Sequence, residues 1–286
     1  MSEQELDLSR RSFVRTAVGG AVGSSFAAAV LPVMASTIKT DSVGLDVGEV
    51  MIPVGDFKMP AYRAMPAGKK NLPVVLVVSE IFGVHEHIAD VARRFAKLGY
   101  LAIAPELFVR QGEAGDYGEI SKLIAEVISQ VPDAQVMGDL DATVAWAAAN
   151  GGDAARVAIT GFCWGGRITW LYAAHSTKVK AGVAWYGKLV GATNSLQTKY
   201  PIDLVAGLHA PLLGLYGGKD EGIPVATVEQ MKAALAAGSK AAKASQFVLF
   251  PEAGHAFNAD YRPSYREADA KEGWARCLAW FKAHGV

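Results

Sequence analysis

The chain has 286 residues, of which 51% are hydrophobic, and its 28 basic side chains balance its 28 acidic ones. This length and composition can bury the large core of one α/β domain. The zero net charge, with no basic run beyond the N-terminus, argues against a nucleic-acid partner. We therefore expect a protein that acts on a small neutral or modestly charged molecule, without nucleic acid or cofactor, as a monomer.

Residues 1–36 differ in character from the rest of the chain. Arg10 and Arg11 stand in a Ser-Arg-Arg-Ser-Phe motif, and residues 16–36 form an uncharged stretch rich in Ala, Gly and Val. The two together look like a twin-arginine export signal that is cleaved near Ala35. A membrane anchor and a disordered leader are the alternatives, but Gly and Ser make the stretch weakly apolar for a permanent span. We expect the mature protein to be periplasmic and to associate with the membrane only through this export signal.

Beyond the leader, apolar segments alternate with helix-like segments. The predicted strands are 47–54, 58–65, 72–79, 100–104, 156–160, 179–185, 211–216 and 246–250. The predicted helices are 87–98, 117–130, 133–150, 166–176, 224–237 and 263–284. Strands separated by helices imply crossovers and parallel pairing. We expect one α/β domain over residues 45–286, a three-layer sandwich around a mainly parallel central sheet.

One predicted strand ends in a turn that is typical of a nucleophile elbow. Residues 157–160 lead into Gly161-Phe162-Cys163-Trp164-Gly165, a Gly-x-Cys-x-Gly turn before a helix-like segment. Such a turn exposes its central side chain, and its glycines are needed because a Cβ there would collide with neighbouring chain. Cys163 is therefore a candidate nucleophile. The ordinary alternative is a small core residue at a strand end, as most lone cysteines are.

Two later strand ends supply an acid and a base. Asp220 lies in the loop after strand 211–216, and His255 lies in the loop after strand 246–250. Nucleophile, acid and histidine follow in the order that an elbow of this kind requires, and the carboxyl ends of parallel strands meet at one edge of a sheet. Each residue alone could be an ordinary loop residue, but together they favour a catalytic triad. The second cysteine, Cys277, is predicted to pack inside the last helix.

With these residues assembled, the chain resembles the dienelactone hydrolase family of α/β-hydrolases from about Val47 to the C-terminus. The resemblance is carried by residues 79–83 (Ser-Glu-Ile-Phe-Gly), 104–110 (Ala-Pro-Glu-Leu-Phe-Val-Arg), 161–166, 218–220 and 254–257. It implies an α/β-hydrolase fold and hydrolysis of a lactone or small carboxylic ester, with a dienelactone-type substrate favoured.

The site residues can be given expected roles. Cys163 attacks the carbonyl to give a thioacyl enzyme, His255 acts as base and then as acid, and Asp220 holds the imidazole. The backbone N–H groups of Ile81 and Trp164 are expected to hold the oxyanion. The resemblance implies that Glu80 contacts the thiol and takes part in its activation. A plain charged loop residue is the alternative for Glu80.

The substrate is less well defined than the chemistry. The resemblance implies that a pair of arginines binds the substrate carboxylate, and Arg110 matches the first of them. The second position holds Ala259, so that cation is missing. Arg262 or Arg266 could replace it, although both could equally be surface charges, as could Arg110. A relative that acts on another lactone or small ester therefore stays open.

A histidine pair, three aromatic residues and the function itself allow more than one interpretation. In His85-Glu86-His87 the alternate residues of a helix start rarely converge on one ion, so we expect no metal site. Trp164, Trp185 and Tyr186 fit a pocket and a core equally well. The alternative function is a catalytically silent thiol-sensing or binding module on the same scaffold. A site without catalytic activity, however, has no physical need for a nucleophile, an acid and a histidine in this order.

Overall fold

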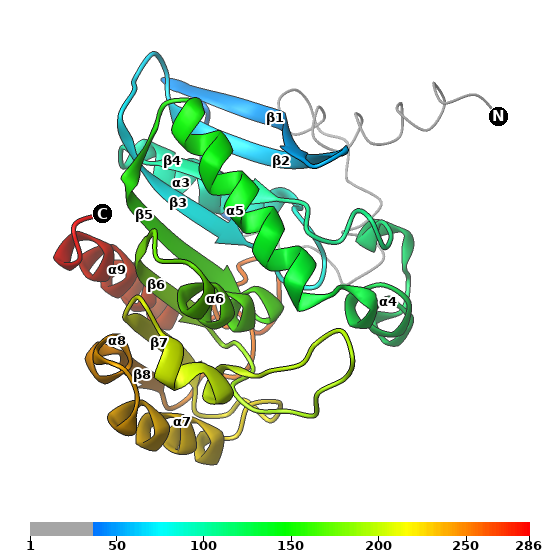
Figure 1. Cartoon of the computed structure of the whole chain (residues 1–286), viewed down its shortest axis with the longest axis vertical. Coiled ribbons are helices and arrows are strands. Elements are labelled where there is room, and N and C mark those ends of the chain that lie inside the picture. Colours follow the sequence, from blue (N-terminus) through cyan, green and yellow to red (C-terminus); the bar gives the residue numbers. More distant parts are fainter. Residues whose placement is uncertain (1–36) are drawn as a thin grey trace.

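The computed structural model describes residues 37–286, so the predicted export signal lies outside the described part of the chain. The described strands form one sheet in the order β1-β2-β4-β3-β5-β6-β7-β8 (Figure 1). Their bounds are β1 Leu45–Val54, β2 Phe57–Pro66, β3 Leu72–Val78, β4 Leu101–Pro105, β5 Gly152–Phe162, β6 Val179–Trp185, β7 Leu212–Gly217 and β8 Gln246–Phe250. The β1–β2 and β2–β4 pairs are antiparallel and the other pairs are parallel, which confirms the mainly parallel sheet.

Helices cover both faces of the sheet. The helices are α3 Glu86–Lys97, α4 Ile120–Glu126, α5 Asp133–Ala149, α6 Trp164–His175, α7 Val225–Ala237, α8 Lys240–Ala244 and α9 Glu267–Ala283. In Figure 1, α5 and α6 lie in front of the sheet, and the Tyr172 hydroxyl of α6 donates to Asp141 of α5 at 2.9 Å. Helix α3 lies behind the sheet and meets α9 through Phe95 and Trp274, whose ring centres are 4.5 Å apart. The result is the three-layer sandwich that the sequence predicts.

Two predicted helices have different bounds in the structure. The helix predicted over residues 117–130 is divided into the short helix α4 and a single 3-10 turn, 128–130, and a separate 3-10 turn, 114–116, precedes it. Val127 and Ile128 are both buried while Ile120 and Ile124 stay exposed, so the segment has no single continuous apolar stripe. The last helix begins at Glu267, not at residue 263, because the preceding residues form turns that bring the Arg266 N–H to the carbonyl of Phe257 at 3.0 Å.

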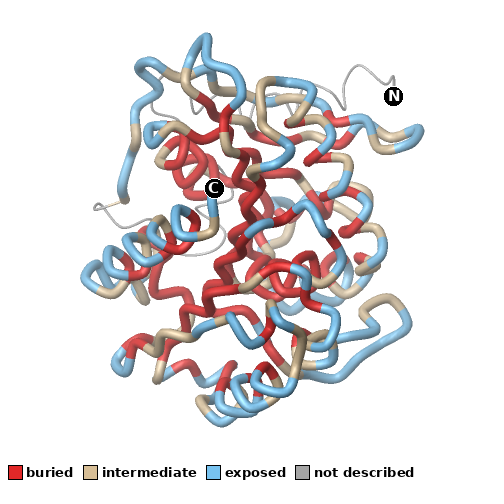
Figure 2. The backbone as a smooth tube through the Cα atoms, turned by 60° about the vertical axis from the view of Figure 1, so that its left-hand side comes forward, coloured by how far each residue is buried: buried red, intermediate tan, exposed pale blue. Residues whose placement is uncertain are grey.

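The core runs through the central strands. Residues 74–78 of β3 and 157–162 of β5 are buried, and Figure 2 shows buried backbone through the middle of the molecule with exposed segments outside it. Strands covered on both faces are continuous apolar runs, as in a parallel sheet. Their rigid packing fixes where the following loops begin, so the loops after β3, β5, β6, β7 and β8 gather at one edge. Within residues 37–286, no helix is long and apolar enough to cross a bilayer.

Candidate active site

Cys163 occupies a strained position between β5 and α6. Its φ is 55° and its ψ is −113°, and its N–H donates to the carbonyl of Trp185 at 3.0 Å. A Cβ on Gly161 would lie 2.2 Å from the Gly165 carbonyl oxygen, and one on Gly165 would lie 2.3 Å from the Val78 carbonyl oxygen. These distances are far shorter than real contacts, so both positions require glycine. The Gly-x-Cys-x-Gly turn thus lets the start of α6 approach the end of β3 closely.

Backbone strain is concentrated around this turn. Among residues 37–286, the non-glycine residues with positive φ are Asn71, Cys163, Tyr186 and Ala256. Cys163 and Tyr186 directly follow β5 and β6, and Ala256 lies in the loop after β8. Such conformations cost on the order of 1–3 kcal/mol each and persist where the surrounding structure enforces them, commonly at functional sites. Three of these four residues therefore mark the same edge of the sheet.

Asp220 and His255 meet at this edge. The Nδ1 atom of His255 lies 2.7 Å from Oδ2 of Asp220, whose side chain is 1% exposed. The other carboxylate oxygen accepts the backbone N–H groups of Gly222 at 2.9 Å and Ile223 at 3.1 Å. Cys163 lies close enough to the same imidazole to contribute to its raised pKa. The structure therefore brings together all three residues of the predicted triad.

The surroundings of His255 favour its protonated form. Burial works against a charged imidazole, but the hydrogen bond to Asp220 and the hydrogen bond and charge of Cys163 raise the pKa of His255 to about 10. An imidazolium between a carboxylate and a cysteine is a source of a proton for a departing oxygen. The arrangement is suited to nucleophilic and acid–base chemistry on a carbonyl compound.

The predicted oxyanion donors lie beside Cys163. Trp164 is the first residue of α6, and Ile81 lies in the loop that follows β3. In the part of the chain that the structure describes, neither of their backbone N–H groups has a protein acceptor. The end of β3 lies close to Gly165, so the loop that carries Ile81 and the start of α6 are neighbours. Their role as oxyanion donors stays a prediction.

Glu80 contacts a histidine in the structure. The carboxylate is buried, and its Oε2 lies 3.4 Å from Nε2 of His85. Burial alone would raise the pKa of Glu80, but the contact with His85 and the charges of His85 and His87 lower it to about 2. The predicted contact between Glu80 and the thiol stays a prediction. From the sequence, His85 is considered only as a metal ligand, although Glu80, an acid after a buried strand and five residues before His85, is a signal of this pair.

The arginines near the site have different partners. Both terminal nitrogens of Arg110 donate to Asp139 at 2.7 Å, and its guanidinium lies 4.5 Å from the Phe57 ring centre. A substrate anion would have to share Arg110 with Asp139, and its binding role stays a prediction. Arg266 is half exposed and pairs with Asp269.

Arg262 is placed differently from both of these. Its guanidinium lies over the Phe82 ring at 4.8 Å and over the Tyr261 ring at 5.6 Å. The charges of Arg262 and Cys163 both influence the ionisation of the Tyr186 and Tyr261 hydroxyls. Arg262 therefore lies at the edge of the candidate site, beside the loop that carries Ile81.

The three aromatic residues that the sequence left undecided separate clearly. Trp185 is fully buried and its indole donates to Thr160 at 3.2 Å, so it belongs to the core. Tyr186 packs edge-on against His255 with ring centres 5.2 Å apart, and its buried hydroxyl has no partner among the described residues. Trp164 is half-buried and packs on Phe108 at 4.6 Å. Tyr186 and Trp164 thus contact the candidate site, whereas the side chain of Trp185 packs in the core next to it.

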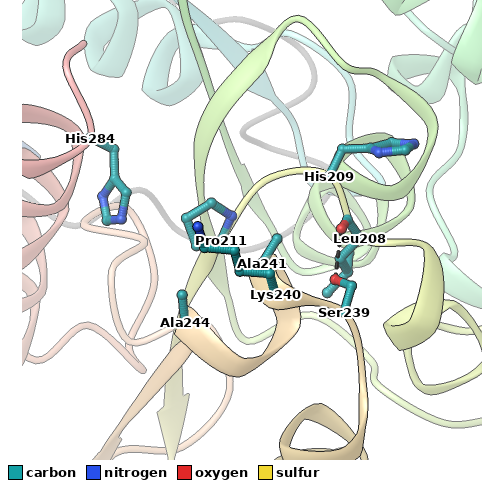
Figure 3. A pocket seen from close by; sticks show the side chains of 8 residues that line it. All are labelled: Leu208, His209, Pro211, Ser239, Lys240, Ala241, Ala244 and His284. Carbon is teal, nitrogen blue, oxygen red and sulfur yellow. Dashed lines mark hydrogen bonds between the residues drawn. The ribbon is translucent and has the colours of Figure 1, made fainter.

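A hollow of about 480 Å³ lies elsewhere on the molecule (Figure 3). Its lining comes from the segments that precede β7 and β8 and from the end of α9: Leu208, His209, Pro211, Ser239, Lys240, Ala241, Ala244 and His284. The hollow is therefore at the amino ends of these strands, whereas Asp220 and His255 follow their carboxyl ends. Ligands of open α/β sheets bind at the carboxyl ends, so the hollow is not the candidate site.

A mainly parallel sheet with a cysteine elbow, followed along the chain by an acid and a histidine at later strand ends, defines an α/β-hydrolase. The model of the dienelactone hydrolase family matches residues 59–285. The chain belongs to this family. The resemblance that the sequence motifs indicate is thus confirmed.

Individual relatives agree with this membership. A protein of Methylorubrum extorquens, provisionally named a carboxymethylenebutenolidase, is 59% identical over 95% of this chain and 93% of its own. A crystal structure from Klebsiella pneumoniae, provisionally named a dienelactone hydrolase, is 57% identical, with a TM-score of 0.81 over 83% of this chain and 98% of its own. A Bradyrhizobium protein, provisionally named a 2-oxo-3-(5-oxofuran-2-ylidene)propanoate lactonase, is 30% identical over 78% of this chain and 89% of its own. The chain is a carboxylic ester hydrolase of the dienelactone hydrolase type.

Proposed function

We propose that the chain hydrolyses a small lactone or ester through a thioacyl intermediate on Cys163. The observation that carries the proposal is the strained elbow at Cys163 next to His255, whose ring is hydrogen-bonded to Asp220. A buried structural cysteine needs neither a positive φ nor a histidine that a carboxylate orients. Cys277 is the contrast within the chain, because it is fully buried and burial raises the pKa of its thiol.

In the first half of the reaction, the sulfur of Cys163 bonds to the substrate carbonyl carbon. The carbonyl oxygen becomes an oxyanion, which the N–H groups of Ile81 and Trp164 stabilise. The oxyanion then collapses, the carbon–oxygen bond of the ester breaks, and the imidazolium of His255 donates its proton to the leaving oxygen. A lactone ring opens in this step, and an acyl thioester remains on the enzyme.

In the second half, the neutral His255 takes a proton from water. The oxygen of that water bonds to the thioester carbon, the carbon–sulfur bond breaks, and the carboxylic acid product leaves. Asp220 keeps the Nδ1 side of the ring occupied, so that Nε2 exchanges the proton. In the first tetrahedral adduct the thiolate is a good leaving group and its departure only reverses the attack. Forward collapse therefore needs an oxygen that leaves as readily, which favours substrates whose leaving oxygen becomes an enolate.

We propose further that the preferred substrate carries a carboxylate near the reacting carbonyl, as a dienelactone does. Arg262 supports this substrate class. The other arginines of residues 37–286 each pair with a carboxylate, whereas Arg262 has none within ion-pair distance and its buried Nε has no hydrogen-bond partner. Guanidinium groups bind carboxylates bidentately. Arg262 would then supply the cation that is missing at Ala259, and the propanoate in the name of the lactonase relative's substrate is also a carboxylate.

A hydrolysis panel tests the function. The full chain is assayed on a carboxylated dienelactone, an uncharged lactone and an activated phenyl ester, beside Cys163→Ala. The proposal requires turnover that Cys163→Ala abolishes and a higher kcat/KM for the carboxylated compound. Equal or better turnover of the uncharged compounds would remove the carboxylate from the proposal. No turnover of any ester, together with reversible oxidation of Cys163 by peroxide, would favour a thiol sensor.

The mature protein acts in the periplasm if residues 1–36 work as proposed. Arg10 and Arg11 support export by the twin-arginine route, which carries folded proteins. Cell fractionation of the wild type and of the Arg10→Lys/Arg11→Lys variant tests this. The proposal requires a periplasmic wild type and retention of the variant in the cytoplasm.

A further inference from the structure

The buried carboxylate of Glu80 is unusual in its surroundings. Its two oxygens are buried without a conventional hydrogen bond from the described residues, and its nearest cationic group is His85 at 3.4 Å. A buried carboxylate without compensation is normally protonated, because burial disfavours charge. The imidazole of His85 is therefore the group placed to offset the effect of burial on this carboxylate.

His85 is directed at this carboxylate and has no role in capping. It is the residue before α3, but its side chain makes no capping hydrogen bond to that helix. Its ring packs edge-on against Tyr261 at 4.9 Å and stacks on His87 at 6.1 Å with an angle of 21° between the planes. These contacts fix the plane of the imidazole that faces Glu80.

A second buried acid–histidine pair stands behind His85. The Nδ1 atom of His87 lies 3.0 Å from Oδ1 of Asp260, and both side chains are almost completely buried. The other oxygen of Asp260 accepts from Arg94 at 2.7 Å. The ring of His87 is thereby held in one orientation beneath His85, and its charge also favours the anionic form of Glu80.

We infer that His85 is a positioning residue of the active site, which keeps Glu80 ionised and fixed in the loop that also carries Ile81, and acts on the reaction through Glu80. The ring of His87, which pairs with Asp260, stacks on the ring of His85 and limits its orientation. The inference rests on the proposed function, because it needs Glu80 to assist the thiol chemistry. It assigns His85 a purpose that neither metal binding nor helix capping supplies.

A double-mutant cycle tests whether His85 acts through Glu80. The variants are His85→Leu, Glu80→Gln and the two combined, with His175→Leu as the matched control, since His175 is half exposed and pairs with Asp141 away from the site. We expect His85→Leu to lower kcat/KM about tenfold or more, the size of an ordinary coupling between contacting residues. In the Glu80→Gln background, the same change is expected to alter kcat/KM by less than about twofold. Equal losses in both backgrounds would overturn the inference.

The pH profile supplies a readout that simple loss of packing would not produce. In His85→Leu the contact that offsets the effect of burial is lost, so the pKa of Glu80 rises. The pH profile of kcat/KM for this variant is therefore expected to gain an acidic limb, in which kcat/KM falls as the pH is lowered. The limb is absent from the wild type and from the double variant. The other charged or titratable groups around Glu80 are His85, His87, Tyr186, Tyr261, Arg262 and Cys163. The raised pKa values of the two tyrosines keep both hydroxyls neutral over this range, so they do not produce the limb.

The protonation of Glu80 can also be measured without turnover. Burial raises the pKa of Glu106 to about 7, so each spectrum is compared with that of the wild type. Infrared spectra of His85→Leu at neutral pH are expected to show an additional protonated carboxyl band, beyond the absorption of the wild type, that disappears in the double variant. The band's absence would contradict the inference even if the enzyme is fully active. Conversely, full activity of Cys163→Ala would overturn the proposed function and leave this band unaffected, so the two failures are distinguishable.

Discussion

The carboxylate of Asp220 is fixed at both of its oxygens, and it aims the ring of His255. Oδ2 lies 2.7 Å from Nδ1 of His255, while Oδ1 accepts two backbone N–H groups of its own loop. The acid therefore cannot rotate away from the imidazole without breaking three contacts. Asp220 and His255 follow β7 and β8, and the pairing of these two strands brings their loops together.

Asp220→Asn is expected to lower kcat about 10³-fold or more, because the charge that stabilises the imidazolium is lost and the ring can adopt the wrong tautomer. Steady-state kinetics on an activated ester measure the loss. Retention of more than a tenth of the wild-type kcat would contradict this role.

The same pair makes stability depend on pH. The pKa of His255 is raised from 6.5 to about 10 in the folded state, so its stabilising contribution is complete below pH 6.5 and is lost as pH rises through about 10. Asp220→Asn removes a hydrogen bond and a charge that raise this pKa. Urea unfolding at several pH values should therefore show a smaller decline in the free energy of unfolding between these limits for the variant. An unchanged decline would show that the pair does not govern it.

Cys163 and Cys277 should differ sharply towards alkylating reagents. Cys163 is partly exposed beside His255, whereas Cys277 is fully buried and burial raises the pKa of its thiol. Iodoacetamide at neutral pH is expected to modify Cys163 in step with inactivation and to leave Cys277 unmodified. Peptide mass spectrometry locates the adducts. Cys277→Ala is the control and should stay active and become inactivated at the wild-type rate.

Arg262→Ala should change substrate preference more than turnover. We expect KM for a carboxylated lactone to rise about tenfold or more, because one charge-assisted contact is lost, while an uncharged phenyl ester is hydrolysed as before. Arg266→Ala is the matched control, since Arg266 pairs with Asp269 at the surface. Equal effects of Arg262→Ala on charged and uncharged substrates would exclude a role in anion recognition.

Gly161→Ala tests the elbow. Its Cβ would meet the Gly165 carbonyl oxygen at 2.2 Å, so backbone must move, and we expect a loss of about 1–3 kcal/mol in the free energy of unfolding together with most of the activity. Gly138→Ala in α5 is the contrasting change, because nothing lies within 4 Å of its Cβ. Alanine at this exposed helical position is expected to stabilise the protein by about 0.5–1 kcal/mol. Thermal or urea unfolding compares the two variants, and similar effects would contradict the close packing of the elbow.

The sequence predicts the sheet and the row of Cys163, Asp220 and His255 because these signals are local. Each residue directly follows an apolar strand, and the geometry of a parallel sheet brings such positions together. The interruption at Val127 of the helix predicted over residues 117–130 could not be predicted from such local signals. It depends on which neighbours bury Val127 and Ile128, and those neighbours come from other parts of the chain.

Side-chain partners were the least predictable part of the site. Arg110 is paired by Asp139, 29 residues further along the chain, and nothing in the pattern around either residue identifies the other. Glu80 turns to His85 because the loop after β3 folds back on the start of α3. Arg262 was one of two equal choices, and only its place over Phe82 separates it from Arg266.

The thioacyl enzyme is the central claim, and trapping it is the most direct test. The enzyme is mixed with an activated phenyl ester, quenched with acid within the first turnover and digested for mass spectrometry. We expect one acyl group per protein on the peptide that contains Cys163, formed at least as fast as steady-state turnover, and neither adduct nor turnover in Cys163→Ala. Turnover of Cys163→Ala at the wild-type rate, or an acyl group on another residue, would contradict the mechanism.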